Sequence, residues 1–317
     1  MSKAAPLLQV NHLSKYFKTP KGVLHAVDDV TFTLEEGKTL GVVGESGCGK
    51  STMGRTILRL LEPTSGEVLF DGQDISKLKK QEMRAMRTNM QMIFQDPFSS
   101  LDPRKSVSQT IMEPLRLHKL VKEKDACMDR VMELMKTVGL AERLANAYPH
   151  ELDGGRRQRI GIARALAVNP RFIVCDEPVS ALDVSIQAQI LNLMKDLQEK
   201  IGLTYMFITH DLSVVNHFSD DIVVMYLGQL VEKAPSETLF AHPTHPYTKA
   251  LLSAIPIPKI GGSRERILLQ GEITSPIDPP KACRFANRCP HATEQCHAEE
   301  PKLKEIEPNH FVACFMV

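Results

Sequence analysis

One stretch of the chain decides its fold: Gly44-Glu45-Ser46-Gly47-Cys48-Gly49-Lys50-Ser51. It follows the apolar run 40–43 and precedes a helical pattern over 51–61, the setting in which G-x-x-x-x-G-K-S/T forms a phosphate-binding loop. The glycines let backbone N–H groups curl around an anion, the helix N-terminus adds a positive dipole, Lys50 adds a charge, and the Ser51 hydroxyl can bind Mg²⁺. We therefore expect a nucleoside triphosphate on Gly44, Glu45, Ser46, Gly47, Cys48, Gly49, Lys50, Ser51 and Thr52.

Apolar runs and amphipathic stretches alternate along the chain. In a strand with one exposed face, apolar and polar residues alternate, whereas a continuous apolar run is typical of a strand buried on both faces. These patterns predict strands at 7–13, 30–34, 40–43, 172–175, 205–208 and 222–225, and helices at 51–61, 124–138 and 186–201. The alternation indicates an α/β fold in which helices cover a mostly parallel sheet.

The pattern changes in two places. Strand signals stop between 97 and 167, where helical periodicity predicts an inserted helical subdomain. The stretch 256–280 is rich in Pro, Gly and Ser and predicts a linker into a small terminal module. We therefore expect a nucleotide-binding domain over 1–255, with its helical subdomain at about 97–167, and a C-terminal extension over 256–317.

Composition excludes several classes of protein. The 317 residues carry 39 Lys+Arg against 38 Asp+Glu, a net charge of +1, so no general basic field favours nucleic acid. With 43% hydrophobic and 24% charged residues the chain is globular and not disordered. No apolar run reaches the roughly 18 residues of a membrane helix. We expect a cytosolic protein that docks on a membrane protein.

Two carboxylates follow the predicted buried strand 172–175, and ligands of open α/β sheets gather at the carboxyl ends of strands. An isolated acidic pair is most often a solvated strand end, but its position downstream of a phosphate loop favours a catalytic role. We expect Asp176 to hold Mg²⁺ and Glu177 to orient, or take a proton from, the water that attacks the γ-phosphate. His210 follows the strand 205–208 and is expected to contact the γ-phosphate.

Further motifs stand in a fixed order around these residues: Gln95 after Met92-Ile93-Phe94, then Leu152-Asp153-Gly154-Gly155-Arg156, then Ser180-Ala181-Leu182-Asp183. With them, residues 7–255 resemble the nucleotide-binding subunit of an ATP-binding cassette (ABC) transporter. The resemblance implies a P-loop NTPase fold of the ABC type, with an antiparallel β subdomain and an inserted helical subdomain. It also implies that two subunits close head to tail on two ATP molecules.

The same resemblance implies roles for single residues. Tyr16 would stack on adenine, and Gln95 would join Ser51 and Asp176 around Mg²⁺ and couple that site to the membrane subunits. The signature segment, Leu152, Asp153, Gly154, Gly155 and Arg156, would contact the partner's ATP. Ser180, Ala181, Leu182 and Asp183 would form the D-loop, with Asp183 facing the opposing site. Lys50, Glu177 and His210 would be the catalytic residues.

The tail resembles the C-terminal extension of oligopeptide and dipeptide importer ATPases of the permease F type. The resemblance rests on His245-Pro246-Tyr247, Leu251-Leu252, Gly271-Glu272, Ser275-Pro276, Pro279-Pro280 and four cysteines, Cys283, Cys289, Cys296 and Cys314. The seven cysteines are an odd number, and a reducing cytosol argues against a disulfide framework. Four thiolates can bind a [4Fe–4S] cluster or tetrahedral zinc. The spacings lack the C-x2-C pairs of structural zinc, so we expect [4Fe–4S], with zinc or unmetallated thiols as alternatives.

The signature segment departs from the usual Leu-Ser-Gly-Gly-Gln of the family, because Asp153 replaces the serine and Arg156 the glutamine. A hydrogen-bond donor to the γ-phosphate has become a carboxylate. Two like charges about 4 Å apart repel by on the order of 4 kcal/mol at an effective dielectric constant near 20. Our hypothesis is an asymmetric pair of sites, in which Asp153 weakens the site on the partner's phosphate loop. The alternative is that Asp153 turns aside and both sites hydrolyse ATP.

The expected function is that of an ATPase energising uptake of oligopeptides or dipeptides from the cytoplasmic face of the plasma membrane. Its expected partners are a second ABC ATPase, two transmembrane permease subunits and an extracytoplasmic peptide-binding protein, and no nucleic acid. A nickel or other solute importer with the same ATPase plan is the alternative cargo assignment. A soluble ABC ATPase acting on ribosomes or DNA is the alternative from another class.

Overall fold

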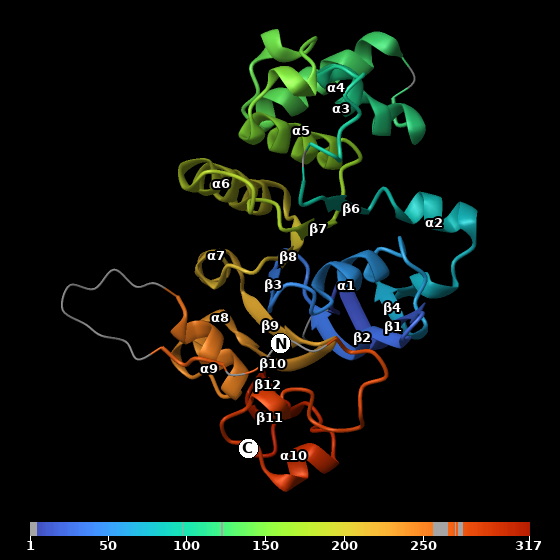
Figure 1. Ribbon diagram of the computed structural model, residues 1–317. Coiled ribbons are helices and arrows are strands. Elements are labelled where there is room, and N and C mark those ends of the chain that lie inside the picture. The colour runs from blue at the N-terminus through green and yellow to red at the C-terminus, as the bar shows by residue number, and fades with distance from the viewer. Residues whose placement is uncertain (1–4, 97, 122, 256–265, 270, 272–274) are drawn as a thin grey trace, which may run out of the picture. The chain divides into compact units, whose positions relative to one another are not determined.

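The computed structural model describes residues 5–96, 98–121, 123–255, 266–269, 271 and 275–317 (Figure 1). The predicted linker at 256–280 therefore falls largely outside the described residues. Two compact units share the chain. The first combines Met1–Glu35, Thr39–Ser76 and Phe207–Val317, and the second combines Glu36–Lys38 with Lys77–Met206.

The first unit holds two sheets. Its strands are β1 (Leu8–Thr19), β2 (Gly22–Leu34), β3 (Thr39–Val43), β4 (Ser65–Phe70), β5 (Gln73–Asp74), β9 (Asp221–Tyr226), β10 (Gln229–Pro235), β11 (Lys304–Glu307) and β12 (His310–Val312). Its helices are α1 (Lys50–Ile57), α7 (Leu212–Phe218), α8 (Ser236–Ala241), α9 (Pro246–Ser253), η4 (Ala286–Arg288) and α10 (Glu294–Ala298). Strand β8 (Thr204–Ile208) and the 3-10 turn η1 (Ile75–Lys77) cross the boundary between the units.

An antiparallel sheet of order β2-β1-β4-β5 begins the chain. Strands β1 and β2 form a long hairpin that pairs Leu8 with Leu34 at one end and Thr19 with Gly22 at the other. The apolar alternation at 7–13 and 30–34 predicted the buried ends of these strands. Beyond these buried ends, the backbone hydrogen bonds between β1 and β2 continue to the tight turn at Thr19 and Gly22.

The second sheet of this unit builds the phosphate loop. All five residues of β3 are buried, and β3 pairs in parallel with β9, as the continuous apolar runs predicted. Strand β10 runs antiparallel to β9, and β12 and β11 follow at the edge, which gives the order β11-β12-β10-β9-β3. The C-terminal extension thus adds two strands to the sheet that carries the loop (Figure 1).

The second unit contains α2 (Lys80–Met86), β6 (Met90–Ile93), α3 (Val107–Leu117), α4 (Lys124–Thr137), η2 (Glu142–Leu144), η3 (Pro149–Glu151), α5 (Gly154–Leu166), β7 (Phe172–Asp176) and α6 (Val184–Ile201). Helices α3, α4 and α5 pack together within the range where helical periodicity replaces strand signals. Strand β6 pairs in parallel with β7, setting Ile93 beside Cys175. No helix in the described ranges is long and apolar enough to span a bilayer.

Candidate nucleotide-binding site

The phosphate loop connects β3 to α1 through backbone that only glycine can adopt. Gly49 has φ +108°, and a Cβ there would lie 2.0 Å from the carbonyl oxygen of Ala26. Gly44 has φ +151°, and its Cβ would lie 2.2 Å from the carbonyl oxygen of Met225. The loop therefore packs against β2 and β9 so closely that any side chain at either position would displace it.

Lys50 places its charge inside this loop. Its side chain is buried, and Nζ donates hydrogen bonds to the carbonyl oxygens of Gly44, at 2.7 Å, and Glu45, at 2.9 Å. Cys48 is buried beside it, and burial raises the pKa of the Cys48 thiol although the Lys50 charge opposes this. Cys48 is therefore a small packing residue, and Lys50 is the cation of the loop.

His210 stands at the edge of the sheet from which the loop emerges. The N–H of Thr209, just after β8, donates to the carbonyl oxygen of Val42 in β3, at 3.1 Å. His210 follows and is exposed, and Asp211 then caps α7 by accepting a hydrogen bond from the N–H of Ser213. Its predicted contact with a γ-phosphate remains a prediction.

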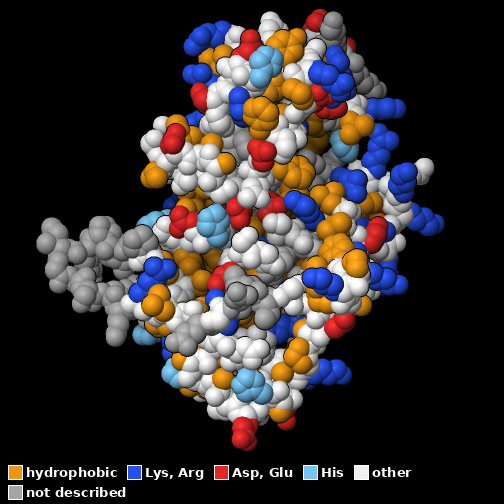
Figure 2. Space-filling view, viewed as in Figure 1, with side chains coloured by type: hydrophobic (Ala, Val, Ile, Leu, Met, Phe, Trp, Pro, Cys, Tyr) orange, Lys and Arg blue, Asp and Glu red, His pale blue; other side chains and the backbone are white. Residues whose placement is uncertain are grey.

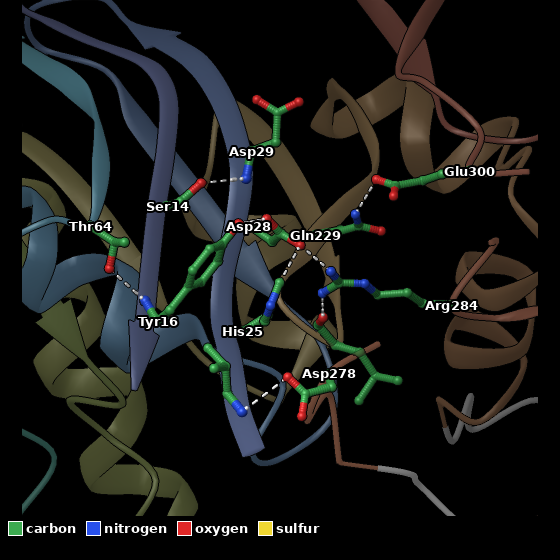
Figure 3. A network of polar contacts seen from close by, with 12 residues as sticks. Ser14, Tyr16, His25, Asp28, Asp29, Thr64, Gln229, Asp278, Arg284 and Glu300 are labelled. Atoms are coloured by element: carbon green, nitrogen blue, oxygen red, sulfur yellow. Dashed lines mark hydrogen bonds and ion pairs between the residues drawn. The ribbon is translucent and has the colours of Figure 1, made fainter. Parts of the chain in front are cut away.

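Tyr16 is held by neighbours that the sequence did not indicate. Its ring stacks on His25 with centroids 3.9 Å apart, and its hydroxyl donates to Asp28 (Figure 3). Asp28 also contacts His25 Nδ1, at 3.0 Å, and Arg284 from the extension. Burial would raise the pKa of Asp28, but these hydrogen bonds and the Arg284 charge outweigh it and hold the pKa below its usual value. Stacking of Tyr16 on adenine stays a prediction.

The acidic strand end in the second unit brings two predicted residues together. Asp176 is fully buried at the end of β7, and Glu177 follows with φ +47°, a left-handed conformation that a residue other than glycine seldom adopts. Gln95 Nε2 donates a hydrogen bond to Glu177 Oε2 at 3.0 Å. The strained turn and this hydrogen bond fix the direction of the Glu177 carboxylate.

Asp153 is the N-cap of α5. Its Oδ1 accepts a hydrogen bond from the N–H of Arg156 at 2.8 Å, and the Arg156 guanidinium lies 3.4 Å from Oδ2. Because an N-cap carboxylate satisfies a free N–H and meets the positive end of the helix dipole, aspartate suits this position. Asp153 and Arg156, the two residues that depart from the usual signature segment, thus contact each other.

The glycines of the signature segment pack against the D-loop and the start of α6. A Cβ on Gly155 would lie 2.6 Å from Ile186 Cγ2, and one on Gly154 would lie 3.0 Å from Leu182 Cδ2. Asp183 is exposed and precedes α6 as its N-cap residue. The structure thus joins two motifs that the sequence separates.

The four tail cysteines lie in the first unit, and no metal site is found among its described residues. The N–H of Cys283 donates to the carbonyl oxygen of Cys296, at 2.9 Å, and burial together with the neighbouring thiols raises the pKa of Cys283 to about 11. Within the described ranges, no group of three or more His, Cys, Asp or Glu side chains could hold a metal ion. The [4Fe–4S] cluster expected from the tail, and the zinc alternative, are therefore not supported. Grouping in sequence did not produce a ligand set among the residues that the structure describes, and burial raises the pKa of Cys283 and of Cys289.

The strand, glycine loop and buried lysine define a P-loop nucleotide-binding protein of the α/β class. The family described as ABC transporter matches residues 27–180, and the family described as oligopeptide/dipeptide transporter, C-terminal region, matches residues 231–296. The oligopeptide transport ATP-binding protein AppF of Bacillus subtilis is 52% identical over 98% of this chain and 97% of its own length. YkfD of the same organism is 53% identical over 98% of this chain and 95% of its own length.

Solved structures agree with these relatives. The dimeric ATP-binding cassette MJ0796, in a post-hydrolysis state bound to ADP and Pi, superposes with a TM-score of 0.67. It is 32% identical to this chain and covers 72% of it and 98% of MJ0796. The cbiO1 protein of Clostridium perfringens, part of the transporter complex cbiONQ, has a TM-score of 0.67 at 27% identity, with 75% and 92% covered. The chain belongs to the ATP-binding proteins of ABC transporters that carry the oligopeptide/dipeptide C-terminal region.

Proposed function

We propose that this chain binds and hydrolyses ATP to energise uptake of oligopeptides or dipeptides. One observation carries the proposal: a glycine loop with Lys50 buried inside it, in a chain about half identical along nearly its whole length to an oligopeptide transport ATP-binding protein. The match continues through the C-terminal region, which narrows the proposal from ABC ATPases in general to those of peptide importers.

The residues assigned to the reaction have suitable chemistry. The loop N–H groups and Lys50 would bind the phosphates and stabilise the charge that develops in the transition state. Glu177 would orient the attacking water or accept its proton, with Gln95 fixing the carboxylate through its Nε2. His210 would contact the γ-phosphate.

Mg²⁺ is the cofactor that this reaction implies, and the side chains fit it. Ser51 offers a hydroxyl, Asp176 a fully buried carboxylate, and Gln95 its amide oxygen, since its Nε2 is the atom that donates to Glu177. Oxygen atoms are the ligands that Mg²⁺ prefers. When bound, the ion would neutralise charge on the β- and γ-phosphates.

The proposed partners are a second ABC ATPase, two transmembrane permease subunits and an extracytoplasmic peptide-binding protein, with this chain on the cytoplasmic face of the plasma membrane. The dimeric state of MJ0796 and the place of cbiO1 in a transporter complex support such an assembly. Nucleic acid is not a proposed partner, because the net charge is +1. Acidic side chains lie among the basic ones on the face shown in Figure 2.

We assign no step of the reaction to the four tail cysteines. A [4Fe–4S] cluster remains the finer hypothesis from the family resemblance, and zinc its alternative. Metal and sulfide analysis of the assembly, purified from anaerobically grown cells, distinguishes them: four irons with sulfide indicate the cluster, one zinc indicates the alternative, and neither indicates free thiols.

Uptake by the reconstituted assembly tests the proposed function. The chain is purified with its co-eluting ATPase and permease subunits and placed in liposomes with the peptide-binding protein, with Mg-ATP on the side of the ATPases. Accumulation of a labelled pentapeptide or dipeptide that requires ATP supports the proposal. Accumulation of labelled nickel without peptide supports the other cargo, and a chain that co-purifies with ribosomes or DNA instead of permeases contradicts the proposal.

A further inference from the structure

The C-terminal extension reaches the phosphate loop directly through Arg288. This residue ends the 3-10 turn η4, and its side chain is only 8% exposed. Its two terminal nitrogens donate to the two carboxylate oxygens of Glu45, at 2.7 and 3.0 Å. Such a paired contact fixes the orientation of both groups, which a single lysine nitrogen would not do.

Glu45, the second residue of the phosphate loop, is held through three groups: its carboxylate, its backbone N–H and its carbonyl oxygen. Its carboxylate meets Arg288, its N–H donates to the Tyr247 hydroxyl at 2.9 Å, and its carbonyl oxygen accepts from Lys50 Nζ. The Glu45 contact raises the pKa of Arg288 above its already high value, so the guanidinium stays charged. The loop is therefore connected to the extension on one side and to its catalytic lysine on the other.

The charge of Glu45 makes this contact relevant to ATP. A carboxylate in a loop that binds a triphosphate adds a negative charge where a polyanion must approach, and like charges repel. The Arg288 guanidinium neutralises that carboxylate and fixes both of its oxygen atoms on the side of the C-terminal extension. Removing Arg288 would leave Glu45 charged and free to face the phosphates.

Arg284, four residues earlier, makes a parallel contact near Tyr16. It donates to Asp28, which also accepts from the Tyr16 hydroxyl, and to the carbonyl oxygen of Leu227 (Figure 3). Gly228 links this cluster to the phosphate loop, because its N–H donates to Cys48 and its carbonyl oxygen accepts from Asp28, both at 2.8 Å. Arg288 thus contacts the phosphate loop itself, and Arg284 contacts Asp28, the hydrogen-bond partner of Tyr16.

The segment that carries both arginines is anchored in the core. Phe285 is 2% exposed, and its ring lies against those of Tyr226 and Tyr247, with centroids 5.2 and 5.5 Å away. Further along, His310 of β12 contacts the fully buried Glu232 of β10 at 2.8 Å. The arginines therefore project from a fixed base, as preorganised positioning groups must.

We infer that Arg288 is a positioning residue for ATP binding, which neutralises Glu45 and holds the phosphate loop open to the triphosphate. Arg284 likewise neutralises Asp28 and so holds the Tyr16 ring in position. This inference rests on the proposed function. It assigns to the C-terminal extension a part in nucleotide binding, since Glu45 belongs to the phosphate loop and Asp28 holds the Tyr16 hydroxyl.

ATPase kinetics of the purified assembly test the inference. In Arg288→Gln we expect the KM for Mg-ATP to rise roughly tenfold, which corresponds to about 1.4 kcal/mol of lost binding, while kcat changes less than about twofold. Arg288→Lys keeps the charge but not the paired geometry, so its KM for Mg-ATP should lie between those of the wild type and Arg288→Gln. The matched control is Arg104→Gln, which removes an exposed ion pair with Asp102.

The double variant Glu45→Gln/Arg288→Gln separates charge from structure. If unopposed charge on Glu45 causes the loss, the double variant binds ATP more tightly than Arg288→Gln alone. A KM for Arg288→Gln like that of the wild type, or a double variant no better than the single one, overturns the inference. Absence of Mg-dependent hydrolysis in the wild-type assembly would instead contradict the proposed function, so the two failures are distinguishable.

Discussion

Gln95 Nε2 donates a hydrogen bond to Glu177 Oε2 across 3.0 Å, joining two residues that are 82 positions apart in the chain. Glu177 already occupies a left-handed backbone conformation, with φ +47°. A hydrogen-bond donor and a strained turn thus fix the side chain to which the attacking water is assigned.

Replacing this donor should slow hydrolysis. In Gln95→Ala the carboxylate loses its donor, and in Gln95→Glu a second carboxylate repels it. We expect kcat to fall by about tenfold in the first and further in the second, since a misplaced catalytic group costs on the order of 10²-fold. The measurement is steady-state ATPase activity at saturating Mg-ATP. Gln91→Glu on the same strand β6 is the control, and equal rates for Gln95→Glu and the wild type would contradict this role.

Gly49→Ala should abolish nucleotide binding without unfolding the protein. The new Cβ would lie 2.0 Å from the Ala26 carbonyl oxygen, so the loop must move away from β2. We expect no measurable binding of a fluorescent ATP analogue and a loss of unfolding free energy of about 1–3 kcal/mol. Gly161→Ala, where a Cβ meets no atom within 4 Å, is the control and should bind normally. Normal binding by Gly49→Ala would show that the loop geometry is not required.

His245 makes the folded protein sensitive to mild acid. Burial and the charge of Lys249 lower the pKa of His245 to about 4 from 6.5, and its Nδ1 accepts a hydrogen bond from the Tyr247 N–H at 3.1 Å. The unfolded chain therefore takes up the proton first, and stability falls as the pH drops from 6.5 toward 4. The loss from this residue reaches about 3 kcal/mol.

Urea unfolding at pH 7 and pH 5 measures this effect. Asparagine can accept the same hydrogen bond without titrating, so His245→Asn should lose less stability between the two pH values than the wild type. An identical loss in both proteins would show that other groups cause the acid sensitivity.

The signature segment predicts unequal ATP sites. Arg156 engages the Asp153 carboxylate, yet a carboxylate still cannot donate the hydrogen bond that serine supplies in the usual segment. We expect Glu177→Gln to abolish peptide uptake. The matching change in the partner ATPase should lower the uptake rate by a smaller factor. The comparison uses initial uptake rates in the same liposomes. Equal losses would indicate that both sites hydrolyse ATP and that Asp153, as the N-cap of its own helix, does not weaken the partner's site.

Local sequence patterns predicted the strand and the helix that flank the phosphate loop, and the buried strands around it. The continuous apolar runs at 40–43, 172–175 and 222–225 became buried parallel strands, because such runs have few other ways to bury both faces. Strands β10 to β12 were not predicted. They are short or rich in polar residues, and each pairs with an edge that the strand before it in the sheet supplies: β10 with β9, β12 with β10, and β11 with β12.

Contacts between distant residues could not be read from local patterns. Arg288 and Glu45 are 243 positions apart, and nothing in the residues around either one indicates the other. Asp28, which joins Tyr16 to Arg284, looks in sequence like one of many surface carboxylates. For the cysteines, grouping in sequence suggested a metal, whereas the part of the chain that the structure describes contains no group of His, Cys, Asp or Glu side chains that could hold one.

Lys50 provides the most direct test of the central claim that a glycine loop and its buried lysine bind the phosphates of ATP. In the reconstituted assembly, Lys50→Ala should lower Mg-dependent ATP hydrolysis about a hundredfold and abolish peptide uptake, because one preorganised charge is worth roughly 10²–10³ in rate. Lys200→Ala, which removes an exposed ammonium on α6, should leave both activities near the wild-type level. Wild-type hydrolysis and uptake by Lys50→Ala would contradict the account.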